Sequence, residues 1–426
     1  MTRLGARAAN PPRPFQPPLP QQPKSLAQRR VGLWLIGGRG SVSTCVVYGL
    51  AGLREGWLDP IGLITAQAPL SDLPLAGFDE IVLGGHDVCR RAMTDSAGEL
   101  VASNILTQDL VTLAAPHATA YEARLRPGLL DDADVGFANL DPETARLGGL
   151  SPREKIEHIA ADLAEFAKSE QLERVIVVHL ASTEAFRPAH DSWLTLEAFE
   201  KSLDQGTSHP ASCLYAYASL ANGHPYVNFT PSPGSSIPAL RELARRRGVP
   251  HCGSDGKTGE TLLKTVLAPM FVARALKVRT WQGYNMLGNR DGEVLADPMH
   301  KESKLRNKND ALRAILGDDE VHTHVGIDYV PSLEDWKTAF DLIHFEGFLR
   351  TRMTLSFTWT GSDSALAAPL VIDLARLADF AAAKGEGGEM PHTASFFKSP
   401  LAGGTHDFSA QFARLVEYAR SHAKGS

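Results

Sequence analysis

The chain has 426 residues, of which 43% are hydrophobic and 22% are charged, and its formal net charge at pH 7 is -6. These values are typical of a globular protein that forms one large domain with an insertion, or two domains. Because Lys and Arg are scattered, no basic surface for nucleic acid is expected. No run of about 18 apolar residues occurs, which argues against a membrane partner. A small-molecule function is therefore favoured.

The N-terminal segment is rich in proline between Pro11 and Pro23. We expect residues 1–29 to form a disordered tail, with a transit or docking role as the alternative. Basic residues without an apolar stretch argue against a secretory signal. The cysteines lack zinc-ligand spacing, so we expect reduced thiols, a cytoplasmic location and no metal site. They are Cys45, Cys89, Cys213 and Cys252.

A glycine-rich turn follows the first predicted strand, residues 31–36, and a helical pattern from 45 to 53 follows the turn. Glycines let a backbone approach a pyrophosphate, and the N–H groups of the helix start point at it. The turn consists of Gly37, Gly38, Arg39, Gly40, Ser41 and Val42. Ser43 replaces the third glycine of the dinucleotide fingerprint, and no acid closes the next predicted strand, 61–65. A plain glycine turn therefore stays the alternative.

Further strands are predicted at 81–83, 135–138 and 174–180, with helices between them. The clearest helix is 152–168, which Ser151 is placed to cap. This alternation predicts a parallel sheet. Ligands bind at the carboxyl ends of strands in such sheets, and polar loops follow several of these strands. The loops are 84–87, 182–184 and 228–232.

The pattern changes after about residue 260. A helix is predicted at 261–275, and strands rich in β-branched and aromatic residues are predicted at 321–330 and 352–359. We expect a second, α+β unit with an antiparallel or mixed sheet. An apolar helix, 365–380, and a flexible glycine hinge, 385–388, follow it.

The segment from Tyr284 to Gly292, followed by Lys304 and Lys308, is the most informative part of the chain. It combines amides, a carboxylate and two ammonium groups, which suits the binding of a phosphorylated polyol and the stabilisation of developing negative charge. The two lysines are four residues apart, where like charges on a helix repel unless an anion lies between them. Solvated surface lysines are the alternative.

With these residues the chain resembles the myo-inositol-phosphate synthase family, also called the inositol-3-phosphate synthases. The similarity runs from the glycine turn to about Lys398 and includes five segments in the family's order. These are 84–87, 253–261, 285–292, 303–308 and 362–369. The resemblance implies an α/β fold, in which a Rossmann-like parallel sheet is interrupted by an inserted α+β catalytic and oligomerisation domain.

The implied division is a cofactor-binding domain at 30–260, a catalytic and oligomerisation domain at 261–366, and a return at 367–426 that carries Lys398. The resemblance further implies tightly held NAD, a homotetramer, and redox-neutral cyclisation of glucose 6-phosphate to myo-inositol phosphate. In that reaction C5 of the open-chain sugar is oxidised, C6 loses a proton and attacks the C1 aldehyde, and the C5 ketone is reduced. Fixed ammonium groups suit the alkoxide and enolate that form.

The resemblance also assigns roles to residues by position. Those implied to be catalytic are Lys304, Lys308, Asp363, Lys398 and Asp291. Those implied to bind the substrate are Asn285, Asn289, Arg290 and Lys257. Beside the glycine turn, those implied to bind the cofactor are Asp87, Ser182, Thr183 and Asp255, with Asp87 near the adenosine ribose.

Two positions depart from eukaryotic members of the family. Asp328 replaces a lysine, and Arg290 replaces a second asparagine, so we expect a changed charge near the sugar. A related possibility is therefore the closure of another hexose phosphate, such as fructose 6-phosphate, to a five-membered ring. The sequence is also compatible with a simple NAD-dependent dehydrogenase or an NAD-binding sensor. Asp363 could also serve only as a helix N-cap ahead of Ala365.

Overall fold

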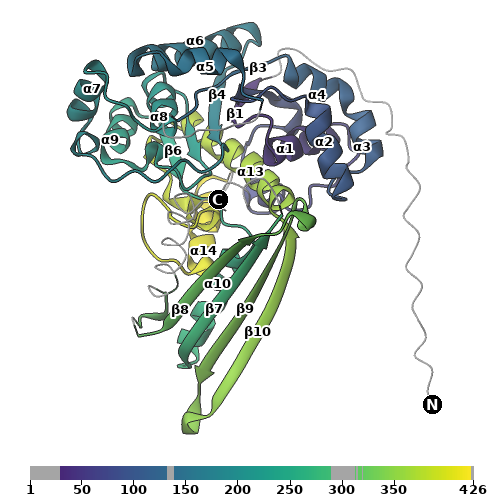
Figure 1. The fold of residues 1–426 in the computed structure, drawn as a ribbon, viewed down its shortest axis with the longest axis vertical. Coiled ribbons are helices and arrows are strands. Elements are labelled where there is room, and N and C mark those ends of the chain that lie inside the picture. Colours follow the sequence, from purple (N-terminus) through teal and green to yellow (C-terminus); the bar gives the residue numbers. More distant parts are fainter. Residues whose placement is uncertain (1–28, 132–138, 289–311, 313–314, 319, 424–426) are drawn as a thin grey trace.

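The computed structural model of the protein describes residues 29–131, 139–288, 312, 315–318 and 320–423 (Figure 1). A seven-stranded sheet in the order β11-β6-β5-β4-β1-β2-β3 forms the larger part, and every neighbouring pair in it is parallel. Its strands are β1 (Val31–Ile36), β2 (Ile81–Asp87), β3 (Leu125–Pro127), β4 (Arg174–His179), β5 (Tyr226–Asn228), β6 (Pro250–Gly253) and β11 (Gly388–Glu389). The predicted parallel α/β architecture is confirmed.

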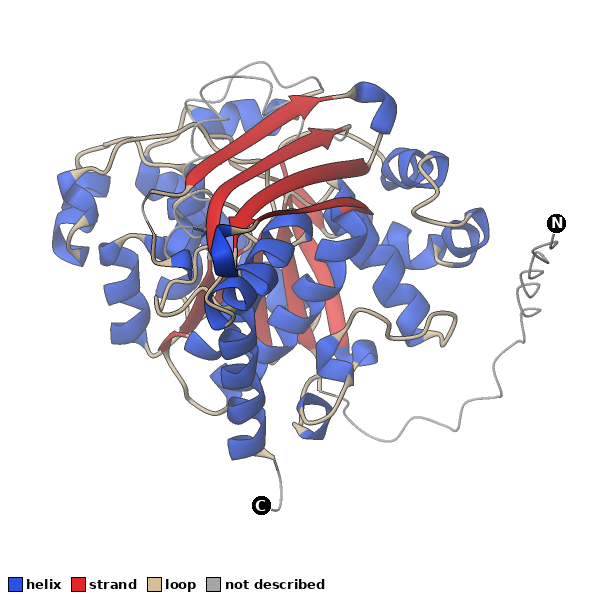
Figure 2. Cartoon of the chain, turned by 90° about the horizontal axis from the view of Figure 1, so that it is seen from below, coloured by secondary structure: helices blue, strands red, loops and turns tan. Residues whose placement is uncertain are grey.

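Helices cover both faces of this sheet (Figures 1 and 2). All of β1 is buried: Leu33 and Leu35 pack into one apolar layer, and Trp34 and Ile36 pack into the other. The first layer contains α1 (Ser41–Arg54), α2 (Met93–Ala102), α3 (Gln108–Leu113), α4 (Ala115–Glu122), α13 (Asp363–Ala383) and α14 (Phe408–His422). The second contains α5 (Pro142–Gly148), α6 (Pro152–Ser169), α7 (Leu196–Asp204), α8 (Ala211–Ala221) and α9 (Pro238–Arg247). Burial on both faces explains the continuous apolar run of β1.

A second sheet has four strands in the order β10-β9-β7-β8. Its strands are β7 (Lys277–Leu287), β8 (His322–Tyr329), β9 (Trp336–Glu346) and β10 (Arg352–Ser362). Only β7 and β8 are parallel, so the sheet is mixed. A mixed sheet is one of the two forms predicted from the sequence, the other being antiparallel. Helix α10 (Gly259–Ala273) packs on its inner face, where Phe271, Trp281 and Ile343 share a core. On the opposite, outer face, Tyr284 and Phe340 are exposed neighbours in register.

Local signals explain where the clearest helix begins. The Ser151 hydroxyl accepts the N–H of Glu154, and the Glu154 carboxylate accepts the N–H of Ser151 at 2.8 Å. These two reciprocal bonds satisfy N–H groups that the first turn of α6 leaves unpaired. The predicted cap is confirmed. No helix in the described part of the chain is long and apolar enough to cross a membrane.

Two local predictions are wrong. Residues 61–65 form a turn and the start of a short 3-10 helix, Ile64–Ala66, and not a strand, because the N–H groups of Ile64 and Thr65 bond to the Asp373 carboxylate at 2.9 and 3.1 Å. Gly388, expected in a flexible hinge, begins β11 and donates its N–H to Val249 at 3.0 Å. The strand predicted at 135–138 and the tail predicted at 1–29, except residue 29, lie outside the described residues.

Candidate functional site

The end of β2 holds the glycine turn between β1 and α1. The N–H groups of Gly37 and Gly38 both donate to the His86 carbonyl oxygen at 2.9 Å. The Tyr121 hydroxyl donates to the Gly38 carbonyl at 2.8 Å. Gly37 has φ of 88°, and a Cβ on it would lie 2.9 Å from the backbone of Ala181. A larger residue would therefore be strained and would push away the loop after β4.

Helix α1 starts directly after this turn, with Gly40 as its N-cap. Because Gly40 has no side chain, it cannot accept from the N–H groups of the first turn, which include those of Ser41 and Val42. Such N–H groups and the positive end of the helix dipole favour an anion. The close backbone approach and the helix start therefore fit the pyrophosphate of NAD.

Asp87 shapes the same turn. Its carboxylate accepts the N–H of Arg39 at 2.7 Å and the N–H of Cys89 at 2.8 Å. Burial raises the pKa of Asp87, and these backbone bonds oppose that rise. The Arg39 guanidinium lies 2.6 Å from Glu122. Both oxygens of Asp87 thus bind the backbone around the turn.

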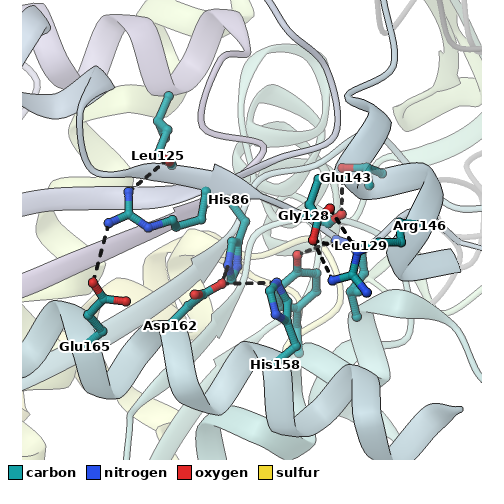
Figure 3. Close-up of polar contacts among 12 residues, drawn as sticks. His86, Leu125, Gly128, Leu129, Glu143, Arg146, His158, Asp162 and Glu165 are labelled. Carbon is teal, nitrogen blue, oxygen red and sulfur yellow. Dashed lines mark hydrogen bonds and ion pairs between the residues drawn. The ribbon is translucent and has the colours of Figure 1, made fainter. Parts of the chain in front are cut away.

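The His86 side chain lies in a buried hydrogen-bonded chain beneath the turn. Trp34 Nε1 donates to His86 Nδ1 at 3.2 Å, so the ring proton is on Nε2, which lies 2.8 Å from Asp162 Oδ2. His158 Nε2 is 3.3 Å from the same oxygen, and Figure 3 shows both rings turned toward this carboxylate. Burial lowers the pKa of His86, which keeps its ring neutral. These hydrogen bonds anchor the end of β2, where the His86 carbonyl oxygen accepts the N–H groups of the glycine turn.

The loop after β4 brings Ser182 and Thr183 to the carboxyl edge of the sheet. Ser182 is exposed and Thr183 is buried. The next residue, Glu184, accepts the N–H and the hydroxyl of Ser212 at 2.6 and 2.5 Å. Since Ser212 is in the first turn of α8, its helix start anchors the loop that carries the two predicted cofactor-binding residues.

Lys398 pairs with Asp255 although 143 positions separate them. Lys398 Nζ lies 2.8 Å from Asp255 Oδ1, and the two side chains are only 11% and 7% exposed. The Lys398 N–H also donates to the Asp255 carbonyl at 2.7 Å. Ser254 and Ser399 exchange backbone hydrogen bonds at 2.8 and 3.1 Å. The structure therefore brings a predicted catalytic lysine onto a predicted cofactor-binding carboxylate.

A second ammonium–carboxylate pair lies at the start of α13. Lys337 Nζ is 3.3 Å from Asp363 Oδ2, and the Thr258 hydroxyl donates to Asp363 Oδ1 at 3.1 Å. The N-cap of α13 is Ser362, whose hydroxyl accepts the N–H of Ala365 at 3.1 Å. Asp363 is therefore not the helix cap, and that interpretation is wrong. Lys337 is absent from the residues predicted from the sequence.

Asp335, two residues before Lys337, joins the starts of two helices. It accepts the hydroxyls of Ser362 and Ser364 at 2.7 and 2.9 Å, and it is also hydrogen-bonded to Ser41 at the start of α1. Burial raises the pKa of Asp335. The loop before β9 thus lies against the glycine turn.

Asp328, expected to change the charge near the sugar, lies on the outer face of the second sheet. It is exposed, and its register partner on β7 is Met286. Lys337 is in register with Leu287, the next residue on β7, whose side chain points to the other face. Asp328 therefore lies on the face opposite Lys337, and the structure does not bring it to the Lys337–Asp363 pair.

Lys257, predicted to bind the substrate, contacts the C-terminal helix. Its Nζ donates to Gln411 Oε1 at 2.6 Å and lies 5.8 Å from the centre of the Phe408 ring. Burial lowers the pKa of Lys257 from 10.5 to about 8. In this structure it joins the loop after β6 to α14.

Asn285 is buried on the inner face of β7, where its amide contacts α10. The remaining site residues predicted from the same motif lie outside the described residues. They are Asn289, Arg290, Asp291, Lys304 and Lys308.

Comparison with solved structures shows which fold this is. Inositol-3-phosphate synthase from Caenorhabditis elegans superposes with a TM-score of 0.83 at 24% identity, covering 93% of this chain and 86% of that one. A myo-inositol-1-phosphate synthase-related protein from Thermotoga maritima has a TM-score of 0.71 at 22% identity, covering 92% and 99%. At these identities the likeness shows a shared fold.

Sequence comparison carries the relationship further. Inositol-3-phosphate synthase 1 from Bacteroides thetaiotaomicron is 32% identical over 416 residues, which cover 90% of this chain and 92% of that protein. A family model described as myo-inositol-1-phosphate synthase, whose name denotes NAD binding, matches residues 31–420. The match spans both sheets and both ammonium–carboxylate pairs, and the chain belongs to the myo-inositol-1-phosphate synthase family.

Proposed function

We propose that the protein is an NAD-dependent inositol-3-phosphate synthase that closes the ring of glucose 6-phosphate. The observation that carries this proposal is the convergence of two ammonium–carboxylate pairs on the loop after β6. Asp255 in this loop binds Lys398, and Thr258, three residues later, binds the Asp363 carboxylate that faces Lys337. The loop lies at the carboxyl end of a strand, where open parallel sheets bind ligands.

The reaction is redox-neutral. NAD bound at the glycine turn would supply the hydride acceptor for the oxidation at C5, and its reduced form would supply the hydride for the final reduction. C5 gives up a hydride and its hydroxyl gives up a proton, C6 gives up a proton, and the C6–C1 bond forms as the aldehyde oxygen gains a proton. A hydride then returns to C5 and a proton to its oxygen, so atoms and electrons balance.

The residues of the chain stabilise charge and move protons in this scheme. In this proposal the ammonium groups of Lys337 and Lys398 stabilise the alkoxide and enolate oxygens, and low exposure strengthens such interactions. Asp363 receives and returns a proton through the Lys337 ammonium that it contacts. Each lysine already has a carboxylate partner, so proton transfer requires no large side-chain movement.

Other roles in the proposal are assigned by family resemblance. The remaining catalytic groups are Lys304, Lys308 and Asp291, and the groups that bind the sugar phosphate are Asn285, Asn289, Arg290 and Lys257. The groups proposed to bind NAD are the turn from Gly37 to Val42, with Ser182, Thr183 and Asp255. Asp87 is proposed to lie near the adenosine ribose, and it also fixes the turn by accepting the N–H of Arg39.

Product analysis tests the proposal. Uniformly ¹³C-labelled glucose 6-phosphate and fructose 6-phosphate are each incubated with the enzyme and a small fraction of an equivalent of NAD, and the products are identified by NMR and mass spectrometry. Inositol phosphate from glucose 6-phosphate alone supports the proposal. A five-membered cyclitol from fructose 6-phosphate overturns the substrate. NADH formed in proportion to product indicates a dehydrogenase, and cofactor binding without turnover indicates a sensor.

We propose that the outer face of the second sheet joins copies of the chain into a homotetramer. Tyr284 and Phe340, neighbours in register on this face, are 42% and 41% exposed. Apolar burial of such aromatic side chains stabilises protein interfaces. Light scattering after gel filtration should show a smaller species for Phe340→Asp, and an unchanged tetramer would remove this face from the interface.

None of the four cysteines, all of which lie among the described residues, forms a disulfide. This is usual for a reducing compartment, and we propose a cytoplasmic location. Cell fractionation with detection of the enzyme tests this location, and recovery from a secreted or organellar fraction would contradict it.

A further inference from the structure

Asn285 belongs to a buried polar cluster between α10 and the inner face of the second sheet. Its Nδ2 donates to Glu260 Oε2 at 2.7 Å, and Glu260 Oε1 lies 2.6 Å from Lys264 Nζ. Lys264 Nζ is also 3.6 Å from Asp341 Oδ1, which accepts the Trp281 indole N–H at 2.7 Å. The relative exposures of Asn285, Glu260, Lys264 and Asp341 are at most 3%.

The cluster has no room to rearrange on its sheet side. A Cβ on Gly283 would lie 2.2 Å from Glu260 Oε1 and 3.0 Å from both Lys264 Nζ and Asp341 Oδ1. The absence of a side chain at Gly283 thus provides the space that the ion pair fills. Close packing of this kind fixes the Glu260 carboxylate in place.

The ion pair determines which end of the Asn285 amide faces Glu260. An ammonium 2.6 Å away favours the ionised form of Glu260, and an ionised carboxylate only accepts hydrogen bonds. The amide must therefore turn its NH₂ group to Glu260 and its Oδ1 away. In the described structure Asn285 Oδ1 is buried and has no hydrogen-bond partner. A buried carbonyl oxygen left without a donor is costly, so this position favours binding of a donor.

The free oxygen lies near the proposed site. Asn285 is in register with Ala339 on β9, and Lys337 is two residues from Ala339 on the same inner face. Diagonal neighbours of this kind lie roughly 7–8 Å apart. Asn285 is therefore a near neighbour of the Lys337–Asp363 pair, within the span of a hexose phosphate.

We propose that Glu260, held by Lys264, is a positioning residue that presents Asn285 Oδ1 to a hydroxyl group of the sugar phosphate. The identity of the ligand rests on the proposed function, whereas the orientation of the amide rests on the cluster alone. Glu260 contributes by disfavouring the flipped orientation of the Asn285 amide. In that orientation the NH₂ group of Asn285 would face the substrate hydroxyl, which needs an acceptor there. The cluster thereby selects polyols over ligands that lack a hydroxyl at this point.

The variant Glu260→Gln tests this role, because the Lys264 ammonium binds the oxygen of the new amide, whose NH₂ group then faces Asn285 and takes up its Oδ1. In the NAD-loaded enzyme, calorimetry should show about tenfold weaker binding of glucitol 6-phosphate, an open-chain polyol phosphate, as for one lost hydrogen bond. Binding of inorganic phosphate should be unchanged, since it lacks the polyol. Unchanged glucitol 6-phosphate binding would overturn the proposal.

Asp341→Asn is the matched control. It also removes one negative charge next to Lys264, but it leaves the Glu260–Asn285 contact intact and can still accept from Trp281. Its affinity for glucitol 6-phosphate should stay within about twofold of the wild type. An equal loss in both variants, or an equal loss for phosphate and polyol phosphate, would make the cluster merely structural and overturn the proposal.

A charge swap covers the case in which Glu260→Gln fails to fold. Asn285→Asp places two carboxylates together and should weaken glucitol 6-phosphate binding strongly. Adding Glu260→Gln restores one donor, one acceptor and the original net charge, so the double variant should bind about tenfold better than Asn285→Asp alone. No recovery would contradict the proposal. Since all these measurements report binding, a failure to form inositol phosphate would be a separate result.

Discussion

Lys337 Nζ lies 3.3 Å from Asp363 Oδ2, which joins the second sheet to the first residue of α13. The Lys337 side chain is 11% exposed and that of Asp363 is 25% exposed, so the pair is mostly shielded from water. A shielded ammonium stabilises a developing oxyanion more than an exposed one does. This contact makes Lys337 the clearest target for mutation in the described structure.

Lys337→Met should lower kcat by about a hundredfold, equivalent to roughly 3 kcal/mol in the barrier, as the loss of one oxyanion donor typically does. The affinity for NAD, measured by fluorescence titration, should change little. Lys277→Met, at an exposed lysine at the start of β7, is the control and should keep full activity. Turnover of Lys337→Met within twofold of the wild type would limit Lys337 to a structural role.

Lys398→Met should destabilise the protein by about 3–5 kcal/mol, because it leaves the buried Asp255 carboxylate without its ammonium. Adding Asp255→Asn should recover most of this loss, since neither partner is then charged. Urea unfolding measures the stability of both variants. Activity should stay low in the double variant, and recovery of activity together with stability would show that the pair is only structural.

Gly38→Val should weaken NAD binding at least tenfold. A Cβ on Gly38 would lie 2.6 Å from Leu125 Cδ2 and 2.7 Å from Tyr121 Oη, so the turn must move. Gly49→Ala, in the middle of α1 with no atom within 4 Å of the new Cβ, is the control and should keep the wild-type affinity. Calorimetry measures the NAD affinity of the wild type and of both variants. Equal affinity in these three proteins would rule out this turn as the cofactor site.

Stability should depend on Lys257 at alkaline pH. Burial lowers the pKa of Lys257 from 10.5 to about 8, so between these values the unfolded chain binds more protons than the folded protein. Stability therefore rises with pH across this window. Relative to Lys257→Met, the wild type should gain up to about 3 kcal/mol between pH 7.5 and 10.5. Chemical unfolding at several pH values checks this, and parallel pH profiles for the two proteins would contradict the lowered pKa.

The fold follows from the sequence where local patterns agree with the packing. The apolar run 31–36 and the Ser151 capping signal each depend on neighbours within a few residues, and the structure has both as predicted. The run 61–65 has similar local content, but Asp373, more than 300 residues away, takes up its N–H groups. Such long-range competition for backbone hydrogen bonds cannot be read from the segment itself.

The candidate site is predictable only in part for the same reason. The resemblance points to Asp363 and Lys398, but it does not identify their partners. Lys337 becomes a site residue because the β9 register turns it inward, and a shift of one residue would turn it outward. Lys257 contacts Gln411, 154 positions away, a pairing that depends on where α14 packs.

Because β11 is the last strand of the larger sheet to be synthesised, this sheet cannot be completed until late in translation. The edge position of β11 beside β6 is filled only after residue 389 has been made, and the Asp255–Lys398 pair forms later still. At typical synthesis rates, on the order of ten seconds separate β6 from β11. During that interval the edge of β6 is open, so a nascent chain that stalls within the second sheet would present an unpaired strand edge to other chains.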